Sequence, residues 1–228
     1  MNLDDLELEA LATRAPSRLE LWPQILSRAN VRSMAEVGVW KGEFAESILG
    51  KCDFLSRYYL IDPWAHLPDW NKPFNVDSAK FDDIYAEAMH RTAFAAGKTV
   101  VLRGQTKDVV DQIPDDSLDL AYIDGDHTLR GITIDLITLC PKIREGGFIG
   151  GDDFVNTPWQ HDARFEPTLV CPFCVYFAEA MRWPIIALPH CQFLMQKTSG
   201  SRFSFTDLTG RYADLSLNKL PPGFPRKA

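Results

Sequence analysis

The chain has 228 residues, of which 46% are hydrophobic and 24% are charged, as is typical of a globular protein with one α/β domain. Its 24 Lys and Arg residues against 31 Asp and Glu residues give a net charge of −7, which argues against a broad nucleic-acid-binding surface. No apolar run reaches the roughly 18 residues that a membrane span needs, and the acidic N-terminal segment lacks a signal-peptide core. We therefore expect a cytoplasmic protein that binds neither nucleic acid nor a membrane.

Strands and helices alternate along most of the sequence. Residues 3–30 carry leucines at helical spacing, interrupted by prolines, and predict two short helices. The expected strands cover residues 33–39, 58–61, 99–102, 118–123, 148–151, 184–188 and 192–197. The expected helices between them cover residues 42–49, 80–96, 107–112, 130–140 and 170–182. This alternation predicts an α/β fold with a doubly wound, Rossmann-like sheet that is mostly parallel with an antiparallel late strand, and with helices on both faces.

Two loops and the chain ends interrupt this pattern. Residues 63–77 are rich in Trp and Pro, and residues 154–168 are irregular, polar and aromatic. We expect residues 1–30 to form a helical extension, residues 31–198 the main domain, and residues 199–228 a proline-containing tail that packs extended on it. The extension or the tail could mediate assembly into a homo-oligomer.

Two carboxylate clusters follow neighbouring strands that read as buried. Asp124, Asp126 and His127 follow the first of these strands, and Asp152 and Asp153 follow the second. One helix-length segment separates the strands, so they should be parallel with a right-handed crossover. Their carboxyl ends then lie on the edge where open α/β sheets bind ligands. Four aspartates gathered there need a cation or a proton to offset their repulsion, whereas helix capping explains only single members of the set.

A second candidate site surrounds the turn after the first strand. Gly38 and Gly42 allow a tight turn and a close approach of the backbone to a ligand, although the dinucleotide spacing G-x-G-x-x-G is missing. Glu36 precedes this turn, and Asp62 ends the next strand, where a carboxylate can accept both ribose hydroxyls of a nucleoside. Together these residues favour a nucleoside site over a purely structural turn and helix cap.

These motifs, together with Gly104-Gln105-Thr106 after the third strand, resemble those of class I S-adenosylmethionine-dependent methyltransferases. The stretch from Ile123 to Asp153 resembles more particularly the metal-dependent O-methyltransferases that include macrocin-type and other sugar-modifying enzymes. The resemblance covers roughly residues 33–155. It implies cofactor contacts from Glu36, Gly38, Gly42, Asp62, Gly104, Gln105, Thr106 and Asp124. It also implies that Mg²⁺, or Mn²⁺ in its place, is held by Asp124, Asp152 and Asp153.

The resemblance implies a Mg²⁺-assisted O-methyltransferase that binds S-adenosylmethionine and acts on a hydroxylated small molecule, such as a sugar or a glycosylated metabolite. A catechol-like acceptor is compatible, because it too presents adjacent oxygens. His127 lies three residues beyond Asp124 and has an ordinary pKa suited to a general base near neutrality, while Asp126 is the competing base. A hydroxylase-like relative and a non-catalytic nucleoside-binding protein on the same fold are the alternatives.

Overall fold

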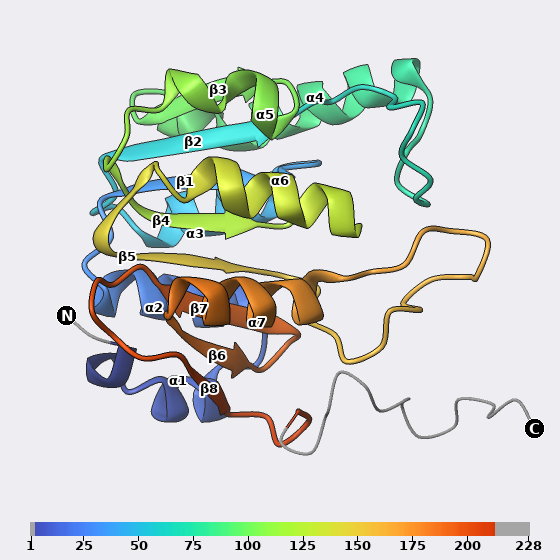
Figure 1. Ribbon diagram of the computed structural model, residues 1–228. Coiled ribbons are helices and arrows are strands. Elements are labelled where there is room, and N and C mark those ends of the chain that lie inside the picture. Colours follow the sequence, from blue (N-terminus) through green and yellow to red (C-terminus); the bar gives the residue numbers. More distant parts are fainter. Residues whose placement is uncertain (1–2, 213–228) are drawn as a thin grey trace, which may run out of the picture.

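The computed structural model describes residues 3–212, and these form an eight-stranded sheet between two layers of helices (Figure 1). The strands are β1 (Ser33–Val37), β2 (Arg57–Asp62), β3 (Thr99–Arg103), β4 (Leu118–Ile123), β5 (Ile143–Gly151), β6 (Pro184–Leu188), β7 (Gln192–Gln196) and β8 (Ser204–Asp207). Their order across the sheet is β3-β2-β1-β4-β5-β7-β6-β8. Strands β1 to β5 pair in parallel, β7 is antiparallel to β5 and β6, and β8 is parallel to β6. The predicted doubly wound, mostly parallel sheet with an antiparallel late strand is confirmed.

Helices cover both faces of the sheet because its strands are apolar on both sides. One layer contains α1 (Leu8–Arg14), α2 (Arg18–Arg28), α3 (Glu43–Lys51) and α4 (Ser78–Thr92). The other contains α5 (Thr106–Val109), α6 (Leu129–Leu139) and α7 (Val170–Met181), drawn in front of the sheet in Figure 1. Each layer of helices packs on one face of the sheet and forms a separate hydrophobic core with it. Successive strand residues point to opposite faces, so Met34 of β1 lies in the core under α1 to α4, and Ala35 and Val37 lie in the core under α5 to α7.

The strand order reverses between β1 and β4, which positions the site. From β1 the chain moves outward to β2 and β3 and then returns to β4 on the other side of β1. At such a reversal the connections leave in opposite directions, and a crevice opens beyond the carboxyl ends of the strands. Loops 63–77 and 154–168 follow β2 and β5 and extend from this same edge, at the arrowhead end of the sheet in Figure 1.

The N-terminal helices, expected as an extension of the main domain, pack directly on the sheet. Trp22 of α2 is fully buried, and its ring meets Tyr122 of β4 edge-on with the ring centroids 4.9 Å apart. Leu21 and Ile25 are fully buried in the same core. The described part of residues 1–30 is therefore integral to the main domain.

The chain beyond residue 198 adds a strand that the sequence did not predict. Strand β8 pairs with β6 at the edge of the sheet, and Tyr212 is buried among core side chains. The sheet thus extends past residue 198, where we expected the main domain to end. Residues 213–228 of the expected tail lie outside the described residues. Among residues 3–212, none of the helices has the length and apolar character that crossing a membrane requires.

Candidate active site

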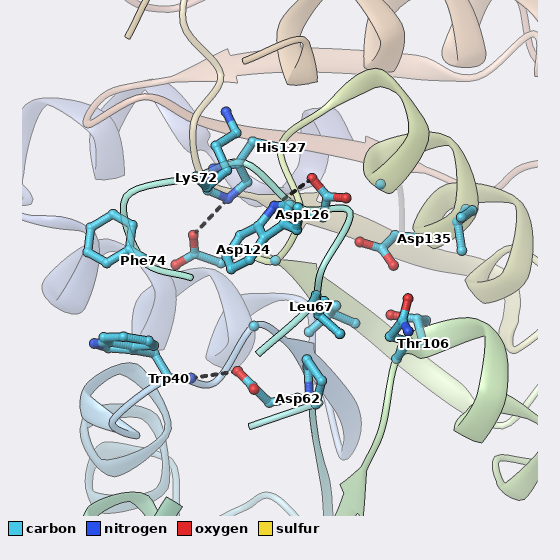
Figure 2. A pocket seen from close by; sticks show the side chains of 18 of the residues that line it. Trp40, Asp62, Leu67, Lys72, Phe74, Thr106, Asp124, Asp126, His127 and Asp135 are labelled. Carbon is cyan, nitrogen blue, oxygen red and sulfur yellow. Dashed lines mark hydrogen bonds and ion pairs between the residues drawn. The ribbon is translucent and has the colours of Figure 1, made fainter. Parts of the chain in front are cut away.

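A cavity of about 690 Å³ opens at the carboxyl edge of the parallel strands. Its walls come from the segments that follow β1 to β5 and from the N-terminal end of α2. In Figure 2, Asp62 lies at one end, Asp124 and His127 lie at the other, and Thr106 lies to one side. Most of the residues that the sequence predicted line this single space: Gly38, Asp62, Gly104, Gln105, Thr106, Asp124, Asp126, His127, Asp152 and Asp153.

Gly38 brings the turn after β1 against the end of β4. Its φ is +86°, and a Cβ at this position would lie 2.0 Å from the carbonyl oxygen of Asp124. The Gly38 N–H donates to the Ile61 carbonyl at 2.9 Å, and the Asp124 N–H donates to the Val37 carbonyl at 2.8 Å. Only glycine fits here, and it allows the two strand ends to approach each other across the floor of the cavity.

Gly42 and Glu36, both predicted to contact the cofactor, do not line the cavity. Gly42 has a φ of +80°, and a Cβ there would lie 3.1 Å from the Cα of Ala88, so this glycine lets α3 pack closely on α4. Glu36 is buried in the core, where its Oε2 accepts a hydrogen bond from the Tyr58 hydroxyl at 2.5 Å. Burial raises the pKa of Glu36 to about 8, and the hydrogen bond from Tyr58 offsets part of this rise.

Asp62 lines the cavity at the end of β2, as predicted, and also fixes two loops. Its Oδ2 accepts from the Trp40 N–H at 2.9 Å, and its Oδ1 accepts from the Trp64 N–H at 2.7 Å. Burial raises its pKa to about 6, although these backbone hydrogen bonds favour the charged form. Because each carboxylate oxygen has two lone pairs, both remain able to accept a further hydrogen bond from a ligand.

His127 lies between two of the predicted carboxylates. Its Nδ1 is 2.6 Å from Asp153 Oδ2. Its Nε2 is 3.5 Å from Oδ1 of Asp124, which lies beside it in Figure 2. Burial alone would lower the pKa of His127, but the hydrogen bonds and charges of Asp124 and Asp153 outweigh it and raise that pKa to about 10. Burial likewise acts to raise the pKa of Asp153, and the His127 partner overrides it and lowers the pKa to about 2. The two side chains form an imidazolium–carboxylate pair at neutral pH.

Asp126 faces the cavity from the turn before α6. Its Oδ1 accepts hydrogen bonds from the Trp70 indole N–H and from the Thr128 backbone N–H, both at 3.0 Å. Thr128, rather than Asp126, caps α6 through its hydroxyl oxygen, which accepts from the Gly131 N–H at 3.1 Å. Asp126 is thus held beside the acidic cluster by a side chain from loop 63–77.

Arg18, the first residue of α2, enters the acidic cluster and was not predicted. Its Nη1 lies 2.7 Å from Asp124 Oδ2 and also contacts Asp152 Oδ2. Burial and the charge of Asp124 raise the pKa of Asp152 to about 6, and Arg18 opposes this rise. One signal was present in the sequence, a basic residue at the start of an otherwise apolar helix face, but nothing there points to the aspartates.

The three aspartates predicted to hold a metal do not form one open set of ligands. Within the described residues, the donor atoms that lie within 4.8 Å of one another come from Asp124, His127 and Asp153. Asp152 is not in this group, since one of its oxygens contacts Arg18 and the other accepts from Gln192 Nε2 at 2.6 Å. The predicted three-carboxylate site therefore does not fit a divalent cation as the side chains lie here.

Comparisons with known proteins agree with this geometry. A family model described as a methyltransferase domain matches residues 35–154, which is more than half of the chain. No curated protein matches the sequence significantly. Among solved structures, the O-methyltransferase TomG from Streptomyces achromogenes, involved in tomaymycin synthesis and in complex with SAM, is 14% identical with a TM-score of 0.55, over 88% of this chain and 92% of that one.

Two further solved structures share the fold. An O-methyltransferase from Bacillus cereus in complex with SAH is 17% identical with a TM-score of 0.55, over 86% of this chain and 89% of that one. The O-methyltransferase NovP is 18% identical with a TM-score of 0.55, over 85% of this chain and 80% of that one. At these identities the likeness shows the fold. With the family match over residues 35–154 and the cavity at the strand reversal, the chain belongs to this methyltransferase-domain family and is a class I S-adenosylmethionine-dependent methyltransferase.

Proposed function

We propose that this chain transfers the methyl group of S-adenosylmethionine to an oxygen of a hydroxylated small molecule. The observation that carries the proposal is one continuous cavity with two chemically different ends (Figure 2). Asp62 and the segment 104–106 lie towards the end suited to a nucleoside, and Asp124, Asp126 and His127 lie at the other. A cofactor bound along this space points its sulfonium methyl towards the charged end.

The reaction needs alignment and a proton acceptor. The acceptor oxygen attacks the methyl carbon from behind, the new C–O bond uses an oxygen lone pair, and the C–S electrons stay on sulfur to give S-adenosylhomocysteine. The hydroxyl proton passes to a base, for which Asp126 and His127 are the candidates on the cavity wall. Both side chains are held by neighbours, Asp126 by Trp70 and His127 by Asp153.

A ring-shaped, hydroxylated acceptor suits the wall beside the charged end. Trp40 meets Phe74 edge-on with the ring centroids 5.6 Å apart, and Phe74 lies 6.3 Å from the His161 ring. All three line the cavity. Such a wall accommodates the apolar face of a sugar or an aromatic ring, so a sugar, a glycosylated metabolite and a catechol-like compound all remain acceptor classes to test. The structurally similar TomG and NovP are O-methyltransferases, which supports an oxygen acceptor.

The alternatives from the sequence are weaker on specific grounds. A hydroxylase of the ordinary non-haem iron type uses two histidines and one carboxylate, whereas the donor group among the described residues has one histidine and two carboxylates. A non-catalytic nucleoside-binding protein would not need the charged end of the cavity. The arrangement of Asp124, Asp152 and Asp153 does not support the Mg²⁺ or Mn²⁺ dependence expected from the sequence, and assembly into a homo-oligomer stays a prediction.

The test combines binding and turnover. Calorimetry should detect S-adenosylhomocysteine binding at one site per chain, and Asp62→Asn should weaken it roughly tenfold or more, because a charged acceptor for the ribose hydroxyls is lost. Asp53→Asn, an exposed carboxylate outside the cavity, is the matched control and should change nothing. A panel of sugars, glycosides and catechols, followed by S-adenosylhomocysteine release, then identifies the acceptor class. Tight NADH binding without S-adenosylhomocysteine binding would contradict the proposal.

A further inference from the structure

Arg18 occupies the position between two aspartates that the sequence assigned to a metal. One guanidinium nitrogen, Nη1, contacts Asp124 at the end of β4 and Asp152 at the end of β5. The same nitrogen lies 3.2 Å from the Tyr122 hydroxyl. A single positive group from α2 therefore bridges the carboxylates of two neighbouring strands.

The packing of α2 holds this guanidinium in place. Its Cζ lies 5.8 Å from the centroid of the Phe44 ring, and Phe44 stacks on Tyr122 with centroids 4.0 Å apart and 11° between the planes. Trp22 follows one helical turn after Arg18, is fully buried, and donates its indole N–H to Gln192 Oε1 at 2.7 Å. Residues four apart share a helix face, so the anchoring of Trp22 also fixes the direction of Arg18. The guanidinium is therefore held against core side chains at the wall of the cavity.

Both carboxylate oxygens of Asp152 contact protein groups. Its Oδ1 accepts from Gln192 Nε2 at 2.6 Å and from the Asp153 backbone N–H at 2.7 Å, while its Oδ2 contacts Arg18. Gln192 is itself fully buried and also accepts from the Tyr122 hydroxyl at 2.9 Å. A divalent cation on Asp152 Oδ2 would have to displace the guanidinium or lie beside this second positive charge in a partly buried site.

We infer that Arg18 is the resident cation of this acidic cluster, which neutralises Asp124 and Asp152 in place of a divalent metal ion and offers its remaining N–H groups to the acceptor. Arg18 lines the cavity and its side chain is 33% exposed. All the hydrogen bonds that Arg18 donates to described residues come from Nη1, so its Nε and Nη2 have no acceptor among those residues. Those groups can bind an acceptor oxygen directly, and this catalytic consequence rests on the proposed function.

The direct test is metal binding rather than activity. Mn²⁺ is titrated into the full chain, with S-adenosylhomocysteine present, and free Mn²⁺ is followed by electron paramagnetic resonance. We expect weak binding by the wild type and, for Arg18→Gln, binding that is roughly tenfold or more tighter because the competing charge is gone. Arg18→Lys keeps the charge and should bind as weakly as the wild type. Arg28→Gln, at the far end of the same helix and paired with Glu7, is the matched control and should also match the wild type.

The possible results are distinguishable from one another. Equal Mn²⁺ affinity in the wild type and Arg18→Gln would overturn the inference, and so would turnover that EDTA abolishes and Mg²⁺ restores. If Arg18→Gln does not fold, the Mn²⁺ affinity of the wild type still decides. Tight Mn²⁺ binding by the wild type would overturn the inference. Weak Mn²⁺ binding, equal to that of Arg18→Lys, would support the inference. Calorimetry of S-adenosylhomocysteine on the same samples separates the two proposals. A chain that does not bind it would contradict the proposed function and leave the Mn²⁺ comparison standing.

Discussion

Glu36 is a carboxylic acid inside the core of the sheet, and its burial couples stability to pH. Burial raises its pKa from 4.5 in the unfolded chain to about 8 in the folded protein. The folded state therefore holds a proton that the unfolded state releases, so its stabilising contribution is present at acidic pH and is lost as pH rises through about 8. We expect Glu36→Gln, which is neutral at every pH and still accepts from Tyr58, to abolish this contribution to the pH dependence.

Urea unfolding at pH 5 and pH 9 measures this effect. The wild type should lose on the order of 3 kcal/mol more unfolding free energy between these values than Glu36→Gln. Glu179→Gln, a change at an exposed carboxylate on α7, should follow the wild type. A Glu36→Gln variant with the same pH slope as the wild type would show that Glu36 ionises normally in the fold.

The identity of the catalytic base is a second question at the scale of single residues. His127 is protonated at neutral pH while Asp124 and Asp153 flank it, and an imidazolium cannot accept a proton. Asp126 is a carboxylate on the cavity wall and keeps Trp70 as its partner. We therefore expect Asp126→Asn to lower the maximal rate by about 10²- to 10⁴-fold, with S-adenosylhomocysteine binding unchanged.

The matching variant is His127→Gln, assayed in parallel across pH 6 to 10. If Asp126 is the base, His127→Gln should lower the rate less than Asp126→Asn does. The opposite order, with near-normal turnover in Asp126→Asn, would restore His127 as the base, as the sequence favours.

At the scale of elements, the helix α6 depends on a glycine for its approach to Asp126. A Cβ on Gly131 would lie 2.2 Å from Asp126 Cγ, so Gly131→Ala must shift that carboxylate. We expect roughly 1–3 kcal/mol of destabilisation from this overpacking, together with reduced turnover.

Gly50 of α3 is the matched helical control, because its Cβ would meet nothing within 4 Å. Gly50→Ala should instead stabilise the chain by roughly 0.5–1 kcal/mol in urea unfolding. Equal effects of the two changes would contradict this packing.

The elements also show which features were predictable from sequence. Apolar runs predicted the strands from β1 to β7, because the central strands of a parallel sheet are covered on both faces, but β5 begins at Ile143 rather than at the predicted residue 148. Strand β8 escaped prediction, since its sequence Ser-Phe-Thr-Asp is short, alternating and at the edge of the sheet. Glu36 was assigned to the cofactor site from its position near Gly38, but β1 turns its side chain towards Tyr58 in the core.

Site residues that follow strands were predictable, and those brought in by packing were not. Asp62, Asp124 and Asp153 end parallel strands, and the topology alone carries them to one edge. Arg18 is 106 residues from Asp124 in sequence, and the two meet only because α2 packs across β4. A contact of this kind depends on tertiary packing, which local sequence patterns do not predict.

At the scale of the whole molecule, loops 63–77 and 154–168 join over the cavity, and Lys72 is their main link. Its buried Nζ donates to the Glu166 carbonyl at 2.8 Å and to the Pro167 carbonyl at 3.3 Å. Asn71 adds hydrogen bonds to Glu166 and to the Arg164 carbonyl. The loops leave from β2 and β5, so this junction closes the cavity across the width of the site.

Lys72→Met should loosen this junction, because the two carbonyls lose a charged donor worth roughly 1.5–3 kcal/mol. Loop 154–168 should open locally at least about ten times as often. Trypsin should cleave after the exposed Arg164 faster by the same factor. Lys80→Met, which removes an exposed lysine paired only with Asp77 among the described contacts, is the control and should leave the cleavage rate unchanged. Mass spectrometry of the fragments measures the rate at Arg164 with and without S-adenosylhomocysteine. Identical rates in Lys72→Met and the wild type would mean that the remaining contacts, such as those of Asn71, hold the two loops together.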